Sequence, residues 1–375
     1  MTGSRRILTV FGTRPEAIKL FPLVHALERD PRFVSRTCSS GQHRELLDPV
    51  LALAGIIPDH DLALMRPGQA LEGLTAALLV GLGTVLDAER PDWVVVQGDT
   101  ATALAATAAA WLRGIPVAHV EAGLRSGDIA HPWPEEINRT LVGAVATLHC
   151  APTTGAAEAL RGEGVDPRTI HVAGNTVIDA LHWMRARLAR EPGLAGGLDE
   201  LAHRYSGKRV IAVTLHRREN LGELSAVAEA IRYLAARSDV AVIFPVHPNP
   251  EVRSAVEPVL SGLANVAMTP PLDYPHFARL LGLAHVVLTD SGGVQEEAPA
   301  LGVPVLVARQ TTERPEGVAA GTARLVGTDT ARIVAEATRL LDDDTAHAAM
   351  ARAHNPYGDG RSAARIVELL AAATA

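Results

Sequence analysis

The sequence predicts an α/β protein made of two Rossmann-like domains, each a doubly wound parallel sheet, that face each other across a cleft. Short runs rich in valine and isoleucine alternate with longer alanine- and leucine-rich stretches of helical period along most of the 375 residues. This alternation is typical of parallel sheets covered by helices on both faces. The length suits two domains of ordinary size. The halves also begin alike, each with basic residues, a buried strand, a charged loop and a helix, in RRILTVFGTRPEAIKL and KRVIAVTLHRRENLGEL.

Short apolar runs mark the predicted strands of each half. In the first half they are residues 7–11, 33–38, 93–96, 117–120 and 170–172, with helices predicted over 15–29 and 71–89. In the second half they are residues 210–214, 240–246, 266–268, 285–289, 303–307 and 323–326. A polar, glycine-containing segment around residues 191–198 interrupts the pattern. We predict an N-terminal domain over 1–176, a C-terminal domain over 177–354, and a C-terminal helix within 355–375 that packs back on the N-terminal domain.

The composition favours a protein of the cytoplasm. A formal net charge of −7 argues against a general binder of nucleic acid or membrane surfaces. Cys38 and Cys150 lie far apart without CxxC spacing, which fits a reducing compartment and gives no disulfide framework. There is no cleavable leader pattern and no run of 18 or more apolar residues. We expect a cytoplasmic protein that binds neither nucleic acid nor membrane.

The stretch HVVLTDSGGVQEEAPAL predicts an anion-binding turn. A buried strand leads into Ser291, Gly292 and Gly293, after which a helix begins. Glycines let the backbone approach a ligand closely, and the N–H groups at a helix start favour an anion such as a diphosphate. Glu296 and Glu297 follow, where a carboxylate can accept hydrogen bonds from both hydroxyls of a ribose. The alternative is that they only cap and charge-balance the helix.

Charged side chains also follow nearly all of the remaining predicted strands. Doubly wound sheets bind ligands at the carboxyl ends of their strands. Each residue alone could be a solvated charge or a helix cap. Together they predict a site with cations for phosphates and carboxylates beside a histidine: Arg14, Lys19, Arg314, Asp99, Glu121, Glu135 and His216. A carboxylate beside phosphates is unfavourable unless it performs acid–base work elsewhere on the ligand. A nucleotide sugar fits this pattern, with its nucleotide on the C-terminal domain and its sugar facing the N-terminal carboxylates.

Several other kinds of site lack their sequence signatures. No GxGxxG follows a strand, and neither GxxxxGK[ST] nor GxSxG occurs. The fifteen histidines never lie two, three or four residues apart, so helical or strand histidine pairs for a metal are absent. We therefore predict a site that uses neither a metal nor a nicotinamide cofactor.

Motifs in colinear order, from about Ile7 to about Arg365, resemble those of one known family. They are FGTRPEAIKLFPLV, GQHRELLD, QGDTATALAA, HVEAGLRSGD, PWPEEINR, GNTVIDAL, TLHRREN, PVHPNP, TDSGGVQEEAPALGVPVLV, TTERPEGV and NPYGDG. The chain looks like a non-hydrolysing bacterial UDP-N-acetylglucosamine 2-epimerase. The resemblance implies a glycosyltransferase-B type fold and a homodimer. It also implies reversible conversion of UDP-GlcNAc to UDP-ManNAc without a cofactor.

The resemblance implies roles for the matching residues. The catalytic group comprises Asp99, Glu121, Glu135 and His216. The substrate-binding residues are Arg14, Lys19, His247, Leu272, Phe277, Ser291, Gly292, Gly293, Glu297 and Arg314, with Leu272 and Phe277 at the uracil pocket and Glu297 at the ribose. Gln42, His43 and Arg66 lie near positions linked to a second, regulatory UDP-GlcNAc in some members. The sequence departs from the family at Gln97, where many members have histidine, at Ala101 and at Leu47, which leaves allosteric control open.

The expected reaction explains why several carboxylates are needed. The hydrogen at C2 of the sugar is not adjacent to a carbonyl, so its direct removal would be very slow. Departure of UDP from C1 gives oxocarbenium character that acidifies this hydrogen. We expect anti elimination to 2-acetamidoglucal and UDP, followed by syn re-addition with the proton delivered to the other face of C2. Inversion needs groups on both faces, which the sequence does not assign.

Other functions compete with this one. A retaining glycosyltransferase of the same fold would need an acceptor site, and a hydrolysing relative would release free ManNAc. An epimerase acting on a modified UDP-HexNAc is a further alternative. A non-catalytic nucleotide-sugar sensor would keep the glycine turn and Glu297 but could dispense with Asp99, Glu121 and Glu135. Because all three carboxylates are present, the sequence favours the epimerase.

Overall fold

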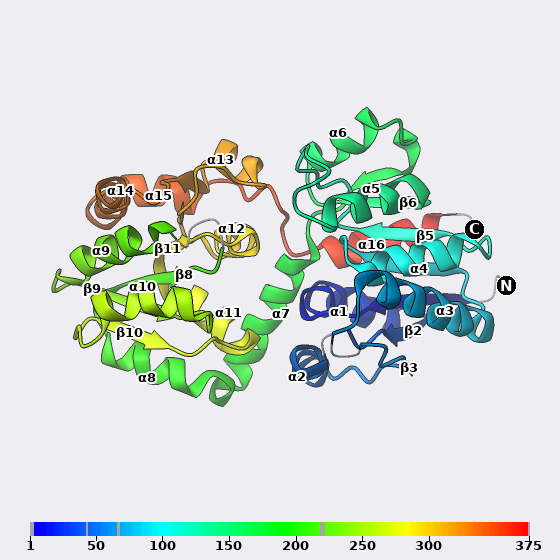
Figure 1. Ribbon diagram of the computed structural model, residues 1–375, viewed down its shortest axis with the longest axis horizontal. Helices are drawn as coiled ribbons and strands as arrows, with labels where there is room; N and C mark the ends of the chain where they lie inside the picture. Colours follow the sequence, from blue (N-terminus) through cyan, green and yellow to red (C-terminus); the bar gives the residue numbers. More distant parts are fainter. Residues whose placement is uncertain (1–3, 43, 66–67, 218–221, 374–375) are drawn as a thin grey trace. The chain divides into compact units, whose positions relative to one another are not determined.

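The computed structural model describes residues 4–42, 44–65, 68–217 and 222–373, which form two compact units (Figure 1). The first unit comprises Met1–Ala180 with Tyr357–Ala375, and the second comprises Leu181–Pro356. The chain therefore passes from one unit to the other twice. These divisions fall after residues 180 and 356, where the sequence analysis placed them after 176 and 354.

A seven-stranded parallel sheet forms the centre of the N-terminal unit. Its strands are β1 (Arg5–Phe11), β2 (Phe33–Ser39), β3 (His60–Asp61), β4 (Trp93–Gln97), β5 (Val117–Val120), β6 (Leu148–Ala151) and β7 (Ile170–Val172). They lie in the order β3-β2-β1-β4-β5-β6-β7. The direction of winding reverses between β1 and β4, which is the switch point where sheets of this kind place their ligands.

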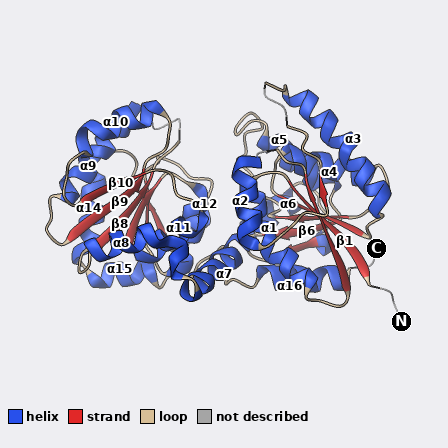
Figure 2. Cartoon of the chain, turned by 90° about the horizontal axis from the view of Figure 1, so that it is seen from below, coloured by secondary structure: helices blue, strands red, loops and turns tan. Residues whose placement is uncertain are grey.

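Helices cover both faces of this sheet (Figure 2). They are α1 (Arg14–Glu28), α2 (Arg44–Ala54), α3 (Leu71–Glu89), α4 (Ala101–Trp111), α5 (Glu135–Val145), α6 (Thr154–Gly162), η1 (Pro167–Thr169) and the first part of α7 (Thr176–Arg190). The final helix, α16 (Ser362–Ala372), packs on α1 in the same unit. Asp179 holds its start by accepting hydrogen bonds from the backbone N–H groups of Ser362 (3.1 Å) and Ala363 (3.0 Å).

The C-terminal unit has a six-stranded parallel sheet in the order β10-β9-β8-β11-β12-β13. Its strands are β8 (Arg209–Thr214), β9 (Val240–Pro245), β10 (Val266–Thr269), β11 (Ala284–Thr289), β12 (Val305–Val307) and β13 (Ala323–Leu325). Its helices after α7 are η2 (Pro192–Ala195), α8 (Gly196–Arg204), α9 (Leu224–Ala235), α10 (Pro250–Leu260), α11 (Tyr274–Leu283), α12 (Gly292–Glu297), η4 (Pro299–Leu301), α13 (Pro315–Ala320), α14 (Thr330–Asp342) and α15 (Asp344–Ala351). The predicted fold class, two doubly wound parallel α/β domains, is confirmed.

Each of the eleven predicted strands is present, but the sequence analysis did not predict β3, β6 or the helical character of residues 191–198. β3 is a two-residue edge strand, and β6 reads LHCA, which carries no valine or isoleucine. The polar segment around 191–198 forms η2 and the start of α8 because Ala195 and Leu198 are buried, with 1% and 2% of their surface exposed. Burial of these two apolar side chains outweighs the low helix propensity of the surrounding glycines.

Among the described residues, α3 is the one helix long and apolar enough to cross a membrane. Its mean hydropathy over an 18-residue window is 1.5, and 33% of that window is buried. Leu74, Leu78 and Leu82 form its buried stripe against α4 in the core of the N-terminal unit. The spacing of four residues between them is that of a helix packed along one face.

The backbone conformation and the close neighbours of Gly123, just after β5, require a glycine at this position. Its φ is +89°, a region that favours glycine, and a Cβ added there would lie 2.2 Å from the carbonyl oxygen of Ala156. Gly127, four residues on, also has a positive φ (+79°), but an added Cβ would meet nothing within 4 Å. Alanine substitutions at the two glycines can therefore distinguish the cost of a positive φ from the cost of a steric clash.

We predict that Gly123→Ala lowers the free energy of unfolding by about 3 kcal/mol, because about 1–2 kcal/mol of left-handed strain adds to overpacking. The control Gly127→Ala should cost only about 1 kcal/mol, since it carries the strain alone. Urea titration followed by tryptophan fluorescence measures both. Equal losses in the two variants would contradict the clash with Ala156.

Candidate active site

The carboxyl ends of β1, β4 and β5 lie side by side in the N-terminal sheet. The loops that follow them carry Arg14, Asp99 and Glu121, and Lys19 lies on α1 directly after the first loop. The parallel register therefore brings together residues that are up to 107 positions apart in the sequence.

Lys19 and Glu121 form a close ion pair. The ammonium Nζ lies 2.7 Å from Oε1 and 2.6 Å from Oε2 of the carboxylate. Glu121 is buried, has a φ of +62°, and also accepts hydrogen bonds from the side-chain amides of Gln97 and of Asn175 (3.1 Å). The structure thus surrounds this carboxylate with N–H donors, which favour its charged form.

Asp99 lies near this pair and is in a different electrostatic environment. Burial raises the pKa of its carboxyl group, and the charge of Glu121 adds to the increase, whereas Arg139 and Lys19 oppose it. Arg139 donates a hydrogen bond to its carboxylate, and Asn138 donates to its backbone carbonyl (2.8 Å). The two carboxylates therefore differ, because Glu121 is surrounded by donors whereas burial favours the protonated form of Asp99.

Glu135 and Glu136 begin α5, and only one of them is engaged by neighbouring residues. Glu136 is buried, accepts a hydrogen bond from the backbone N–H of Ser126 (3.0 Å) and lies 3.2 Å from Arg139. Glu135 is half-buried, and its carboxylate contacts no cation or hydrogen-bond donor among the residues that the structure describes. Of the two, Glu135 is the one available to a ligand.

Glu16 connects two of these loops and was missed by the sequence analysis. Its carboxylate accepts hydrogen bonds from the backbone N–H groups of Gly12 (3.0 Å) and Thr13 (2.8 Å), and from the hydroxyl of Thr100 (2.6 Å). Burial raises its pKa, and these hydrogen bonds oppose the increase. The capping-box pattern T-x-x-E was the available signal, since it predicts that Glu16 folds back on Thr13.

The predicted regulatory residues are only partly described. Gln42 is half-buried, and its side-chain oxygen accepts a hydrogen bond from Thr102 (3.3 Å). His43 and Arg66 lie outside the described residues. Arg14 is exposed at the first position of α1. A regulatory site stays a prediction.

In the C-terminal unit, β11 leads into the predicted glycine turn and α12. A Cβ added at Gly292 would lie 3.8 Å from the guanidinium of Arg314 and 4.0 Å from that of Arg217, so both cations lie beside the helix start. Arg314 also donates a hydrogen bond to Glu296, which fixes its position. A helix start flanked by two guanidinium groups attracts an anion. The Glu297 carboxylate is close to the same turn, because its Oε2 would lie 3.7 Å from a Cβ at Gly293.

His216 is held by Asp290 at the end of the neighbouring strand. Its Nδ1 lies 3.2 Å from Oδ1 of Asp290, and its backbone N–H also donates to that carboxylate (3.1 Å). Burial alone would raise the pKa of Asp290, but hydrogen bonds from His216 and Arg217 hold the pKa below its usual value. The ring of His247 stacks near that of His216, with centroids 6.2 Å apart. Asp290 thus orients the predicted catalytic histidine.

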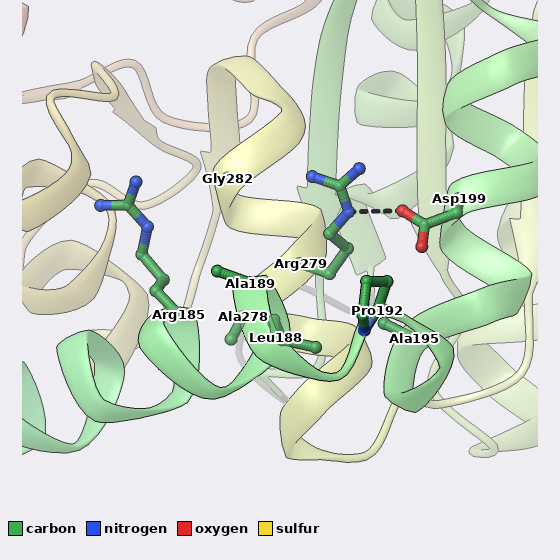
Figure 3. A pocket seen from close by; sticks show the side chains of 9 residues that line it. All are labelled: Arg185, Leu188, Ala189, Pro192, Ala195, Asp199, Ala278, Arg279 and Gly282. Carbon is green, nitrogen blue, oxygen red and sulfur yellow. Dashed lines mark hydrogen bonds and ion pairs between the residues drawn. The ribbon is translucent and has the colours of Figure 1, made fainter.

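Two further features bear on what the C-terminal unit can bind. Leu272 and Phe277 are partly buried and pack against the core cluster that includes β8 and α11 residues. A cavity of about 360 Å³ lies in the same unit among α7, η2, α8 and α11 (Figure 3). It is lined by Arg185, Leu188, Ala189, Pro192, Ala195, Asp199, Ala278, Arg279 and Gly282, and Arg279 pairs with Asp199 at 2.7 Å. None of the predicted site residues lines this cavity.

The described part of the chain contains no group of three or more His, Cys, Asp or Glu side chains that could hold a metal ion. The arrangement found instead is carboxylates with a lysine at the strand ends of one unit, and a glycine turn with two arginines in the other. Together with the two sheets, it defines a two-domain α/β protein of the glycosyltransferase-B type.

Comparisons with known proteins identify the family. The family model for UDP-N-acetylglucosamine 2-epimerase matches residues 25–371, and the chain belongs to this family. It is 51% identical to the UDP-N-acetylglucosamine 2-epimerase of Salmonella typhimurium over 371 residues, which covers 97% of this chain and 98% of the relative. The enzyme of Escherichia coli (strain K12) is equally similar, with 51% identity and coverage of 97% and 98%.

Solved structures agree with this assignment. The UDP-GlcNAc 2-epimerase of Neisseria meningitidis, bound to UDP-GlcNAc, has a TM-score of 0.87 and 42% identity and covers 98% of this chain and 99% of its own. A putative UDP-N-acetylglucosamine 2-epimerase from Listeria monocytogenes has a TM-score of 0.89 and 43% identity, with coverage of 98% and 96%.

Proposed function

We propose that this protein interconverts UDP-GlcNAc and UDP-ManNAc by inverting C2 of the sugar, without hydrolysing either. The observation that carries the proposal is the set of carboxylates at the ends of β4 and β5 and the start of α5, with Lys19 paired to Glu121. The Neisseria relative binds UDP-GlcNAc, which supports this nucleotide sugar as the substrate here. No metal or nicotinamide cofactor takes part in the scheme.

In this proposal the nucleotide binds to the C-terminal unit. The turn at Ser291, Gly292 and Gly293 takes the diphosphate, with Arg314 beside it. Glu297 takes the ribose hydroxyls, and Leu272, Phe277 and His247 contribute to the same binding surface. Because Asp290 holds the Nδ1 side of His216, the Nε2 side serves the departing diphosphate. Preorganised cations and N–H groups stabilise the charge that develops on UDP as it leaves.

In this proposal the N-terminal carboxylates carry out the proton transfers at C2 of the sugar. In the elimination, the C1–O bond to UDP and the C2–H bond break, a C1=C2 double bond forms, and a carboxylate takes the proton. In the re-addition, UDP attacks C1 while a carboxyl group on the opposite face returns a proton to C2. The donors around Glu121 favour it as the proton acceptor, and the raised pKa of Asp99 favours it as the proton donor. Glu135 is the third candidate. Arg14 and Lys19 contact the phosphate and the sugar from the N-terminal unit.

We predict that Asp99→Asn, Glu121→Gln and Glu135→Gln each lower kcat by at least about 100-fold, because each removes a proton carrier. UDP binding, measured by calorimetry, should stay within a few-fold of wild type, since none of the three carboxylates binds UDP in this proposal. The control Glu158→Gln removes an exposed carboxylate on α6 and should keep full activity. Formation of UDP-ManNAc, followed by chromatography, is the readout. Full activity in all three variants would refute the assignment, and free ManNAc as the product would indicate a hydrolysing enzyme.

A cytoplasmic location is part of the proposal. Cys38 and Cys150 are both buried free thiols, and burial raises the pKa of each to about 12. Buried protonated thiols are compatible with a reducing compartment. Cytoplasm is also where a soluble nucleotide-sugar enzyme meets its substrate.

We also propose that the protein forms a homodimer through α3, α4 and α5. These helices pack side by side and expose large apolar side chains, between 36% and 71% accessible: Val80, Trp111, Leu112, Ile137, Leu141 and Val145. Large apolar side chains exposed on neighbouring helices are a feature of interaction surfaces. A second copy of the same face would cover it, as expected for a two-fold interface.

The double variant Trp111→Glu, Leu141→Glu should be monomeric at concentrations at which the wild type is dimeric, because each copy would place two charges, and the dimer four, in the shared interface. Size-exclusion chromatography with light scattering gives the mass. Tyr233→Glu, at an aromatic side chain that is 63% exposed in the other unit, is the control and should stay dimeric. A monomeric wild type, or a dimeric double variant, would contradict this interface.

A further inference from the structure

Glu121 has a backbone conformation that does not form without support. Its φ is +62°, in the left-handed region, where a non-glycine residue costs about 1–2 kcal/mol. Its side chain is also buried, with 6% of the residue exposed. A buried charged group in a strained backbone position persists only where neighbouring groups hold it.

Gln97 is one such neighbour. It is the last residue of β4, it lies opposite Val120 in the β4–β5 register, and 4% of its surface is exposed. Its side-chain Nε2 donates a hydrogen bond to Oε2 of Glu121. The β4–β5 register therefore places the buried amide of Gln97 beside the carboxylate of Glu121, which follows β5.

Asn175 is the second neighbour, and its orientation is fixed by a separate interaction. Its Oδ1 accepts a hydrogen bond from the backbone N–H of Val177 (3.1 Å) at the start of α7. The other side of the same planar amide, Nδ2, therefore faces Glu121 and donates to Oε1 (3.1 Å). Asn175 is 2% exposed, so water does not replace these bonds.

The C-terminal segment holds Asn175 in turn. The backbone N–H of Asn175 donates to the carbonyl of Tyr357 at 2.6 Å, and Tyr357 is 1% exposed. Asp179, one helical turn further along α7, accepts hydrogen bonds from the backbone N–H groups of Ser362 and Ala363. Residues 357–363 are thus attached to the same part of α7 that positions the amide.

From this geometry we propose that Gln97 and Asn175 are positioning residues that hold Glu121 as the proton acceptor, and that the C-terminal segment fixes the Asn175 amide. This inference rests on the proposed function. Amides suit this positioning role because they donate hydrogen bonds without transferring a proton. They therefore hold the Glu121 carboxylate in place and leave it able to accept the proton of the sugar. Lys19 contacts Glu121 through an ion pair, which balances the charge of the carboxylate, whereas the two amides hold its orientation.

Asn175→Asp tests the proposal without removing the helix cap. Aspartate is as good an N-cap as asparagine, so α7 should still form, but it has no N–H to donate to Glu121. We expect kcat for UDP-GlcNAc to fall roughly 100-fold, the effect of displacing a reacting group by about 1 Å, while KM and UDP affinity stay within about three-fold. Gln97→Met, which keeps the side-chain length, should give the same division between kcat and KM.

Asn265→Asp is the matched control. Asn265 is half-buried, and its side-chain amide donates to the backbone carbonyls of Ala235 (3.1 Å) and Arg237 (3.0 Å) in the C-terminal unit. It should lower the unfolding temperature and leave kcat unchanged. Wild-type kcat in Asn175→Asp and Gln97→Met would overturn the proposal, as would a loss of kcat, UDP affinity and thermal stability together. A wild-type protein that does not epimerise UDP-GlcNAc would instead refute the proposed function, and the role of Glu121 with it.

Discussion

The ion pair between Lys19 and Glu121 is the interaction on which the N-terminal site depends. A carboxylate that is only 6% exposed loses most of its hydration, and one cation rarely compensates for that loss unless the remaining lone pairs are also satisfied. Here Gln97 and Asn175 supply those further hydrogen bonds. The carboxylate is therefore paired, buried and fixed at the carboxyl end of β5, next to the switch point of the sheet, which suits the role of proton acceptor proposed for it.

Hydrogen-bonding partners also fix the other predicted site residues. Asp99 is paired with Arg139, Arg314 with Glu296, and His216 with Asp290. Each pair connects a loop to a helix or an adjacent strand, so the reactive groups are held by rigid elements. In the C-terminal unit the pairs leave guanidinium groups beside the start of α12, and in the N-terminal unit they leave carboxylates.

The strands and the glycine turn could be predicted because their signals are local. Apolar runs of valine and isoleucine mark a buried strand wherever they occur, whereas β6, with its buried His149, has no such run. Charged residues after strands were also recognisable, which is how Lys19, Asp99, Glu121 and His216 became candidates for the site. Their partners were not, because Arg139 and Asn175 lie 40 and 54 positions from the carboxylates they contact. Only the sheet order brings such residues together.

The most direct test of the account is proton NMR of the wild-type protein with UDP-GlcNAc in D2O, with no added metal or nicotinamide. Epimerisation by elimination breaks the C2–H bond, so deuterium should enter C2 of both UDP-GlcNAc and UDP-ManNAc as the two reach equilibrium. Interconversion with the C2 proton fully retained in both would contradict the elimination and the role of the carboxylates in it. An unchanged spectrum would contradict the activity itself.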